Sequence, residues 1–158
     1  MVATSAGILL YRLSPDLEVL IAHMGGPYWA SKDAGAWSIP KGEFVEGEEA
    51  ALDAAIREFH EELGVDPPAG PFAELGTFAY SSGKRITVFV ADGAGFSLDG
   101  LAFGEFEMEW PPRSGRTASF AEIDRMEWTT PDAATDRLVK GQRAALEALQ
   151  SHLAESGG

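Results

Sequence analysis

The stretch EEAALDAAIREFHEELGV, residues 48–65, decides the fold, because helical periodicity and a clear end signal coincide in it. It predicts one helix over 48–63 that ends at Gly64, and two prolines, Pro67 and Pro68, follow closely. On a helical wheel with about 100° per residue, the large apolar side chains fall on one stripe, which we expect to be buried. These side chains belong to Leu52, Ile56, Phe59 and Leu63.

The same helix carries a second, acidic face. Glu58, Glu61 and Glu62 project from one side, above the small side chains of Ala51 and Ala54, and no basic residue shares that side. Glutamates on a helix face are usually solvated, and like charges at these spacings cost only about 0.2–0.5 kcal/mol per pair. Clustered carboxylates are also the ligands that a hard divalent cation such as Mg²⁺ requires. The spacing alone leaves both interpretations open.

Residues 42–65 resemble the signature of the Nudix hydrolases: Gly, five residues, Glu, seven residues, then Arg-Glu-x-x-Glu-Glu-x-Gly. Counting back seven residues from Arg57 gives Glu49, as the signature requires, but Gly42 lies one residue farther from Glu49 than in the signature. We favour a loop with one additional residue, because a loop absorbs an insertion at lower cost than a helix. The alternative is that Glu48 takes the place of the first glutamate.

Three runs outside the signature, GGPYW at 25–29, WSIPKG at 37–42 and WPPRSGR at 110–116, are similar to the branch described as predicted nucleotide pyrophosphohydrolases. The resemblance implies an α/β fold, the Nudix α/β/α sandwich. This fold has a mixed β-sheet, a central helix made by the signature, and a C-terminal helix. We expect it to form a single domain over residues 1–158.

The activity implied by the resemblance is Mg²⁺-dependent or Mn²⁺-dependent hydrolysis of the pyrophosphate bond in a nucleoside diphosphate linked to another moiety. Nucleoside triphosphates are the first candidates. Divalent ions suit this chemistry because they neutralise phosphate charge and activate water. Dinucleoside polyphosphates such as diadenosine polyphosphates are the alternative, favoured by the run 37–42 and by Tyr80. A nucleotide-binding sensor without turnover is a third reading, although such modules often lose signature glutamates that are all present here.

The resemblance also implies roles for individual residues. Glu58, Glu61 and Glu62 would bind the metal and act in catalysis, with a main-chain carbonyl from the Lys41-Gly42 turn. Glu61, Glu62 or a glutamate outside the signature would accept the proton of the attacking water. Replacing Glu61 or Glu62 by Gln is therefore expected to abolish turnover and leave the fold intact.

A more distant carboxylate is expected at the same site. Glu122 resembles the distal glutamate that many family members bring to the metal and to catalysis, and its alternative is an ordinary surface carboxylate. Glu107, on the polar face of a predicted strand, is the second choice. Arg57 lies off the acidic face, with Asp53 one turn earlier as a charge partner. In the family this arginine is a structural brace for the loop through the first glutamate, here Glu49.

Substrate contacts are expected from a few basic and aromatic side chains. Arg113 and Arg116, on either side of a glycine, could bind phosphates with bidentate geometry, and a solvated loop is the alternative. Exposed aromatic side chains in a loop are suited to stacking on a base, or they cover the edge of the core. The expected substrate-binding residues are Tyr28, Trp29, Lys32, Lys41, Tyr80, Arg113 and Arg116.

Alternating apolar runs on either side of the helix predict strands. Two hairpins are expected, one from 7–13 and 18–23 around a turn at 14–16, and one from 72–80 and 85–91. The other expected elements are a loop over 25–35, a strand over 36–39, a loop over 40–47, strands over 106–110 and 120–128 around the loop 111–119, and a helix from Pro131 through Glu155.

Charge and composition exclude several classes of function. The chain of 158 residues has 12 Lys and Arg against 25 Asp and Glu, a net charge of −13, which argues against binding of long nucleic acid. A small phosphorylated substrate is allowed if a cation neutralises the local charge. The absence of cysteine excludes thiolate metal sites, and the three histidines share no ligand pattern. We expect a cytoplasmic protein without membrane contact, because no apolar run reaches about 20 residues and no signal peptide is evident. The oligomeric state is not indicated.

Overall fold

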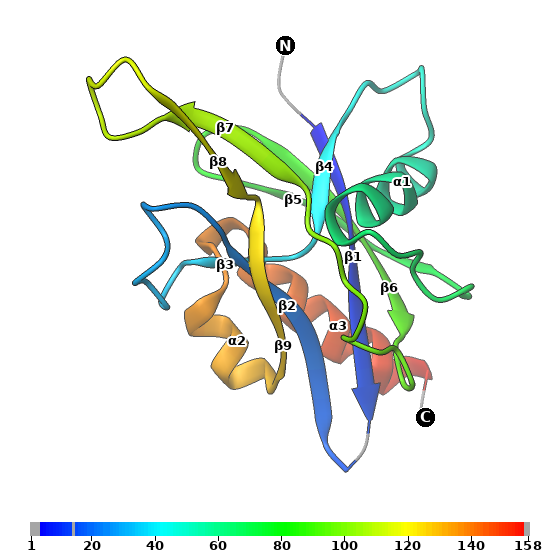
Figure 1. The fold of residues 1–158 in the computed structure, drawn as a ribbon. Helices are drawn as coiled ribbons and strands as arrows, with labels where there is room; N and C mark the ends of the chain where they lie inside the picture. Colours follow the sequence, from blue (N-terminus) through cyan, green and yellow to red (C-terminus); the bar gives the residue numbers. More distant parts are fainter. Residues whose placement is uncertain (1–3, 14, 157–158) are drawn as a thin grey trace.

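In the computed structural model, a mixed β-sheet lies between helices on its two faces (Figure 1). The structure describes residues 4–13 and 15–156. Within this part of the chain the sheet has seven strands: β1 (Thr4–Leu13), β2 (Leu17–Met24), β3 (Trp37–Ser38), β4 (Lys41–Phe44), β5 (Ala73–Ala79), β6 (Arg85–Asp92) and β9 (Ile123–Thr129). Their order is β3-β2-β1-β6-β5, with β4 paired to β1 and β9 to β2, and β1 runs parallel to β6.

Helix α1 (Ala51–Leu63) covers one face of this sheet, and α2 (Pro131–Arg137) and α3 (Arg143–Ser156) cover the other. A short 3₁₀ turn, η1 (Lys140–Gln142), separates α2 from α3. The predicted α/β/α sandwich is therefore confirmed. Among the described helices, none combines the length and the apolar character that a membrane span needs.

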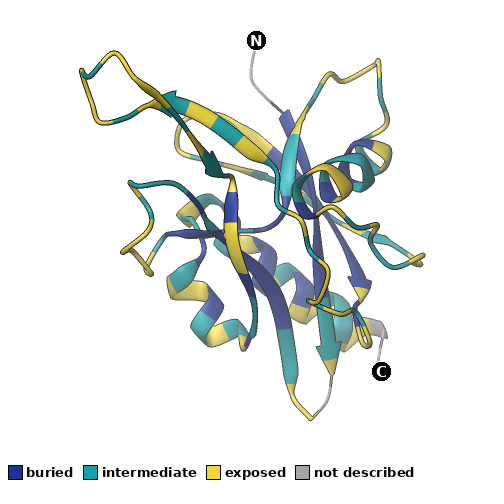
Figure 2. Ribbon diagram, in the orientation of Figure 1, coloured by how far each residue is buried: buried dark blue, intermediate teal, exposed yellow. Residues whose placement is uncertain are grey.

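Each face of the sheet has its own hydrophobic core, because alternate residues of a strand point to opposite faces. Ile8 and Leu10 of β1 pack with Phe59 and Leu63 of α1, whereas Leu9 packs on the other face with Leu149 of α3. The buried segments accordingly run through the central strands (Figure 2).

Both predicted hairpins are confirmed, since β1 pairs antiparallel with β2 and β5 with β6. The first hairpin turn was expected at 14–16, and its first residue, Ser14, lies outside the described residues.

Helix α1 begins at Ala51, three residues later than predicted. The backbone amides of Glu48 and Glu49 both donate to the carbonyl of Val45, at 3.1 and 3.3 Å, so these two residues form a turn before the helix. The helix ends as predicted at Gly64, whose φ of 74° is the left-handed conformation that glycine tolerates best.

The buried stripe of α1 is wider than the helical wheel indicated. Phe59 and Leu63 are fully buried, and Leu52 and Ile56 are partly buried against the same core. Ala54, which was expected beneath the acidic face, is fully buried instead. The reason is that α1 packs against both β1 and β4, so two flanks of the helix are covered.

The loop expected over 40–47 was a wrong prediction in its first half, where β4 forms. Lys41 pairs with Gly7 and Gly42 with Ala6 of β1. Four residues of mixed polarity carry no readable period, so only this long-range pairing defines the strand.

The C-terminal helix expected from Pro131 through Glu155 is interrupted at Leu138. This residue forms a parallel bridge with Trp37, and the amide of Val139 donates to the Trp37 carbonyl at 2.9 Å. Pairing with β3 thus replaces helical hydrogen bonds at this point, and the chain resumes as a helix at Arg143.

Strands β7 (Glu105–Glu109) and β8 (Thr117–Ala121) form a separate two-stranded sheet. Together with residues 110–116, which connect them, these strands make up the arm, which projects from the body (Figure 1). Every residue of these two strands is exposed or partly buried. The expected loop 111–119 is shorter than predicted because β8 begins at Thr117. The strand expected over 120–128 is two strands that are broken at Glu122.

Candidate active site

A pocket of about 150 Å³ opens between the C-terminal end of α1, the start of β4 and the junction of β8 with β9. Glu62 and Glu122 supply carboxylates to this pocket from distant parts of the chain, and Lys41 supplies a positive charge. The other lining residues are Ala22, Met24, Ser38, Ile39 and Ile123. Two acidic groups and one basic group therefore face a small space with otherwise uncharged walls.

Backbone hydrogen bonds carry Glu122 to this pocket. The amide of Gly104 donates to the carbonyl of Glu62 at 3.2 Å, and the amide of Glu122 donates to the carbonyl of Gly104 at 2.8 Å. On its other side, the carbonyl of Glu122 accepts from the amide of Gly25 at 2.9 Å. The break between β8 and β9 is thus tied to α1 and to β2, which places Glu122 beside the helix that carries Glu62.

Burial raises the pKa of Glu62 to about 8. The negative charges of Glu122 and Glu58 contribute to this rise, whereas the charge of Lys41 and a hydrogen bond to the Lys41 backbone oppose it. In the absence of a bound cation, Glu62 therefore retains its proton at neutral pH.

This raised pKa predicts a pH-dependent stability for the metal-free protein. The carboxyl group of Glu62 binds its proton more tightly in the folded chain, with a pKa of about 8, than at the ordinary value of 4.5. The folded state therefore binds more protons than the unfolded state between these values, so the free energy of unfolding falls as pH rises through that window.

The variant Glu62→Gln cannot ionise and should lack this part of the slope. Chemical denaturation of both proteins in a chelator, at several pH values across the window, measures the difference. Equal slopes for the two proteins would contradict the environment assigned to Glu62.

The carboxylate of Glu58 lies directly against Gly42. A methyl group added at Gly42 would overlap the carboxyl carbon and oxygens of Glu58, so the absence of a side chain there makes the space that Glu58 occupies. Burial raises the pKa of Glu58, and a hydrogen bond from Arg57 opposes the shift. The charges of Glu61 and Glu122 also raise it.

Arg57 forms hydrogen bonds with three acidic residues, one in the turn before α1 and two on α1 itself. Its guanidinium donates to both oxygens of Glu49, at 2.9 and 2.8 Å, and also to Glu58 at 2.8 Å and Glu61 at 3.3 Å. These contacts replace the pairing with Asp53 that the helical wheel suggested. The turn before α1 brings Glu49 next to the arginine. There the planar guanidinium donates two hydrogen bonds to one carboxylate, which is a strong geometry for this pair of groups.

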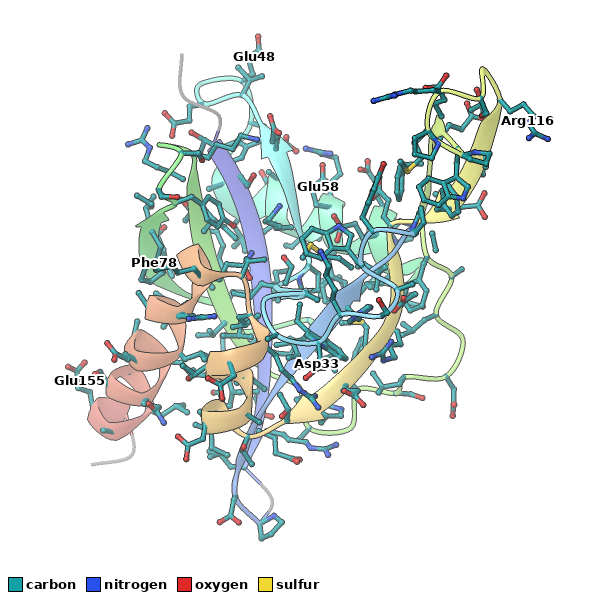
Figure 3. The ribbon with its side chains drawn as sticks, turned by 90° about the vertical axis from the view of Figure 1, so that its left-hand side faces the viewer. Asp33, Glu48, Glu58, Phe78, Arg116 and Glu155 are labelled. Atoms are coloured by element: carbon teal, nitrogen blue, oxygen red, sulfur yellow. The ribbon has the colours of Figure 1, made fainter. Side chains whose placement is uncertain are left out.

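Of the two candidates for the first glutamate of the signature, Glu49 contacts Arg57. Glu48 is exposed, at the outer end of the loop before α1 (Figure 3).

No three His, Cys, Asp or Glu side chains in residues 4–13 and 15–156 form a group that could hold a metal ion as they stand. One reason is that Arg57 engages Glu58 and Glu61, and the Glu61 side chain is 55% exposed beside it. The chemistry of the donor set nevertheless fits a hard divalent cation. The charge of Glu122 raises the pKa of Glu58 and of Glu62, and carboxylate oxygens are the ligands such a cation prefers.

A second pocket, of about 320 Å³, adjoins the first and shares Met24, Ser38 and Lys41 with it. Tyr80 and Lys84, from the turn between β5 and β6, line its other side. Its lining is completed by Ser82 and Val139. Two expected substrate-binding residues, Lys41 and Tyr80, therefore share one pocket.

Sequence reasoning missed Lys84. The sequence did contain a signal for it, because the short turn 81–84 of this hairpin brings Lys84 next to Tyr80. The amide of Tyr80 donates to the carbonyl of Lys84 at 2.8 Å.

Tyr80 is held in place by a buried amide that the sequence did not indicate. Gln142 is fully buried, and its Nε2 donates to the Tyr80 hydroxyl at 3.0 Å and to Ser38 Oγ at 2.9 Å. Its Oε1 accepts from the backbone amide of Ile39 at 2.8 Å. The ring of Tyr80 lies against Gly141, where an added methyl group would overlap it.

The expected aromatic and basic residues of the loop 25–35 lie outside both pockets. Tyr28 is 55% exposed and packs edge-on against Trp110 of the arm, with ring centroids 5.5 Å apart. Trp29 packs partly against the core, and the Lys32 amine lies 5.4 Å from the centroid of its ring. The sequence left open whether these aromatic side chains stack on a base or cover the edge of the core. In the structure both of them contact other side chains of the protein.

The arm carries the remaining expected residues. Arg113 and Arg116 are exposed, and Arg116 lies near the tip of the arm, away from Glu58 (Figure 3). Glu107 is exposed on β7, opposite Ser119. None of these three residues lines either pocket.

Residues 1–149 match the family model of the NUDIX domain. The chain is 36% identical over 90 residues to an uncharacterized 17.7 kDa protein in the e-segB intergenic region of Enterobacteria phage T4. That alignment covers 56% of this chain and only 58% of the length of the phage protein.

Several solved structures share the fold. An Ap4A hydrolase from C. elegans, in a binary complex, has a TM-score of 0.63 at 21% identity, covering 96% of this chain and 98% of that one. The NUDIX domain of Shewanella oneidensis NrtR, complexed with ADP ribose, has a TM-score of 0.62 at 15% identity, with 97% and 89% covered. A MutT protein from Methanosarcina mazei Go1 has a TM-score of 0.59 at 17% identity, with 95% and 94% covered. At these identities the likeness concerns the fold.

Proposed function

The chain belongs to the NUDIX domain family, and from this membership we propose that it hydrolyses phosphoanhydride bonds in the pocket between Glu62 and Glu122. The bond cleaved is the pyrophosphate link of a nucleoside diphosphate joined to another moiety, with nucleoside triphosphates as the first substrates. The observation that carries the proposal is the convergence of Glu58, Glu62 and Glu122 on one another, beside Lys41. Such charge concentration beside a pocket is typical of a catalytic site.

Glu58 and Glu62, with the backbone at Lys41 and Gly42, would hold Mg²⁺ or Mn²⁺. When bound, the ion supplies neutralisation of phosphate charge and lowers the pKa of a water molecule. The pairing of Arg57 with Glu49 braces the loop before α1 and holds Glu58 at the end of the helix that faces this backbone.

Proton transfer is assigned to Glu122. It lines the pocket together with Glu62 and is exposed, so a water that enters can reach it. Arg57 is bonded to Glu58 and Glu61, so those carboxylates are already engaged by a cation. A carboxylate free of such a partner is better placed to accept a proton during attack on phosphorus.

The second pocket would hold the nucleotide. Lys41 lies in both pockets, so it can contact phosphates next to the cleaved bond, and Lys84 can contact phosphates farther along the chain. The side chains of Met24, Tyr80 and Val139 offer apolar surface for a base. Because one lysine lines both pockets and another lines only the second, they could contact successive phosphates of a long chain. This arrangement also favours the second candidate activity, cleavage of a dinucleoside polyphosphate, whose phosphate chain is longer.

The variant Gly141→Ala tests whether the second pocket binds substrate. Its methyl group would overlap the ring of Tyr80 and push it from its place beside Gln142. We expect KM to rise by about tenfold with kcat changed far less, because binding contacts common to substrate and transition state affect KM alone. Steady-state kinetics measure both constants. An unchanged KM, in a variant that melts like the parent, would contradict substrate binding at Tyr80.

The experiment that tests the proposed function is a screen of nucleotides with Mg²⁺ and with Mn²⁺. The panel contains nucleoside triphosphates, nucleoside diphosphates joined to sugars, and diadenosine polyphosphates, and the products are identified in ¹⁸O-water. Release of a nucleoside monophosphate with one ¹⁸O atom in a product is the expected result. Faster turnover of diadenosine polyphosphates would select the second activity. Tight binding without any turnover would overturn hydrolysis in favour of a sensor.

A further inference from the structure

His23 lies outside both pockets but is joined to the segment that carries Glu122. It is fully buried on β2, and both of its ring nitrogens face oxygen atoms. Nδ1 lies 2.8 Å from Oδ1 of Asp124 on β9, and Nε2 lies 2.7 Å from the carbonyl oxygen of Lys32 in the loop between β2 and β3. One side chain thus connects two strands and a loop.

The chemistry of these partners makes the connection specific. A carbonyl oxygen only accepts, so Nε2 of His23 donates to Lys32. Nδ1 then either donates to the ionised carboxylate of Asp124 or accepts from its protonated form. In both cases a proton lies between His23 and Asp124. Because a buried polar group that loses its partner is costly, this contact fixes the Asp124 side chain.

Asp124 is the additional residue of a β-bulge. His23 pairs with Arg125 across the ladder between β2 and β9, and the next residue, Met24, pairs with Ile123. The register therefore shifts at this point and leaves Asp124 without a residue opposite it. The residue that the bulge inserts is the one whose side chain His23 holds.

The bulge decides which face of the sheet Ile123, the residue after Glu122, takes. Ile123 and Met126 are three residues apart, so in a regular strand they would face opposite sides of the sheet. Both pack in the core beneath α1, which means that the chain before Asp124 is turned over relative to the rest of β9. In this arrangement Glu122 lines the pocket with Glu62. Without the bulge, Ile123 would turn to the other face, and Glu122, which directly precedes it in the chain, would move out of the pocket with it.

We propose that His23 and Asp124 are positioning residues for the hydrolytic site. Asp124 stabilises the bulge that directs Glu122 into the pocket, and His23 holds Asp124 while it anchors the loop through Lys32. The inference rests on the proposed function, because it assigns a purpose to the placement of Glu122. Neither His23 nor Asp124 lines either of the two pockets described above, so they act through Glu122 and not on substrate.

Two variants of one residue test the proposal. Asp124→Asn keeps the shape and can donate to Nδ1 of His23, while Nε2 still donates to Lys32. Asp124→Ala removes the contact. We expect Asp124→Ala to lower kcat by about tenfold or more, since small misplacements of catalytic groups have effects of this size. Asp124→Asn should stay within about threefold of the parent. Equal losses in the two variants would overturn the proposal.

A double-mutant cycle asks whether the effect passes through Glu122. In a Glu122→Gln background, Asp124→Ala should lower the residual kcat no further, because residues that act as a unit are not additive. If Asp124→Ala lowered kcat by the same factor in both backgrounds, Asp124 would act independently of Glu122, and the proposal would be overturned.

Hydrogen exchange separates this inference from the proposed function. The amides of Gly25 and Glu122 form the backbone bonds on either side of the Glu122 position. In Asp124→Ala these two amides should exchange faster than in the parent, and in Asp124→Asn they should not. This readout needs no substrate, so it decides the inference even if no nucleotide is hydrolysed. Unchanged exchange in Asp124→Ala, or faster exchange in Asp124→Asn, would overturn it.

Discussion

Replacing Glu62 by Gln is expected to lower kcat by about a thousandfold or more, the scale seen when a group that stabilises transition-state charge is lost. Glu62 is the carboxylate of α1 that lines the pocket, and Lys41 and the Lys41 backbone both interact with it. Gln keeps the shape and the hydrogen bond but cannot carry the negative charge. The melting temperature should not fall, because the substitution removes an ionisable group from a site that disfavours its charge.

The matched control is Glu61→Gln, one residue earlier. The sequence treated Glu61 and Glu62 as equivalent, but the structure separates them: the Glu61 side chain is 55% exposed and reaches Arg57 at 3.3 Å. We expect this variant to keep kcat within about tenfold of the parent, since an exposed ion pair contributes little. Rates measured with saturating nucleotide and divalent cation compare the two. Equal losses in both variants would contradict the assignment of Glu62 to the pocket and of Glu61 to its outer edge.

The variant Gly42→Ala is expected to lower kcat by about a hundredfold with little loss of stability, because displacements near 1 Å have effects of this size. The new methyl group would overlap the carboxylate of Glu58, which is the flexible end of a side chain and can move. Gly42 has none of the positive φ angles found at other glycines in the described residues, so alanine suits its backbone. Glu58 would leave its place beside the Lys41–Gly42 backbone, while β4 would stay paired with β1.

A second cycle tests this explanation. In a Glu58→Ala background there is no carboxylate for the methyl group to displace, so Gly42→Ala should cost no further activity. Thermal unfolding of all the variants confirms that they are folded. A further hundredfold loss in the Glu58→Ala background would mean that Gly42 matters for another reason, and a parental kcat in Gly42→Ala alone would refute the importance of the Glu58 position.

Much of the fold followed from local sequence. The apolar period of residues 52–63 and the glycine at 64 defined α1, because helix burial repeats every three to four residues and a left-handed end favours glycine. Both hairpins were predictable for the same reason, since alternation and a turn signal lie close together in sequence. The errors occurred at β4, at the break near Leu138 and at the division between β8 and β9. Each of these is defined by pairing with a distant strand or loop.

The site divides in the same way. The sequence alone determined that one helix carries both a buried stripe and three carboxylates, since residues on one helix have fixed relative directions. Only the tertiary structure decided that Glu62 faces the pocket, that Glu122 lies beside it, and that Gln142 holds Tyr80. The contacts responsible join residues about a hundred positions apart, such as His23 with Asp124 and Ser38 with Gln142. A local period reports which side of an element is buried, but strand pairing and a bulge determine which distant side chain it meets.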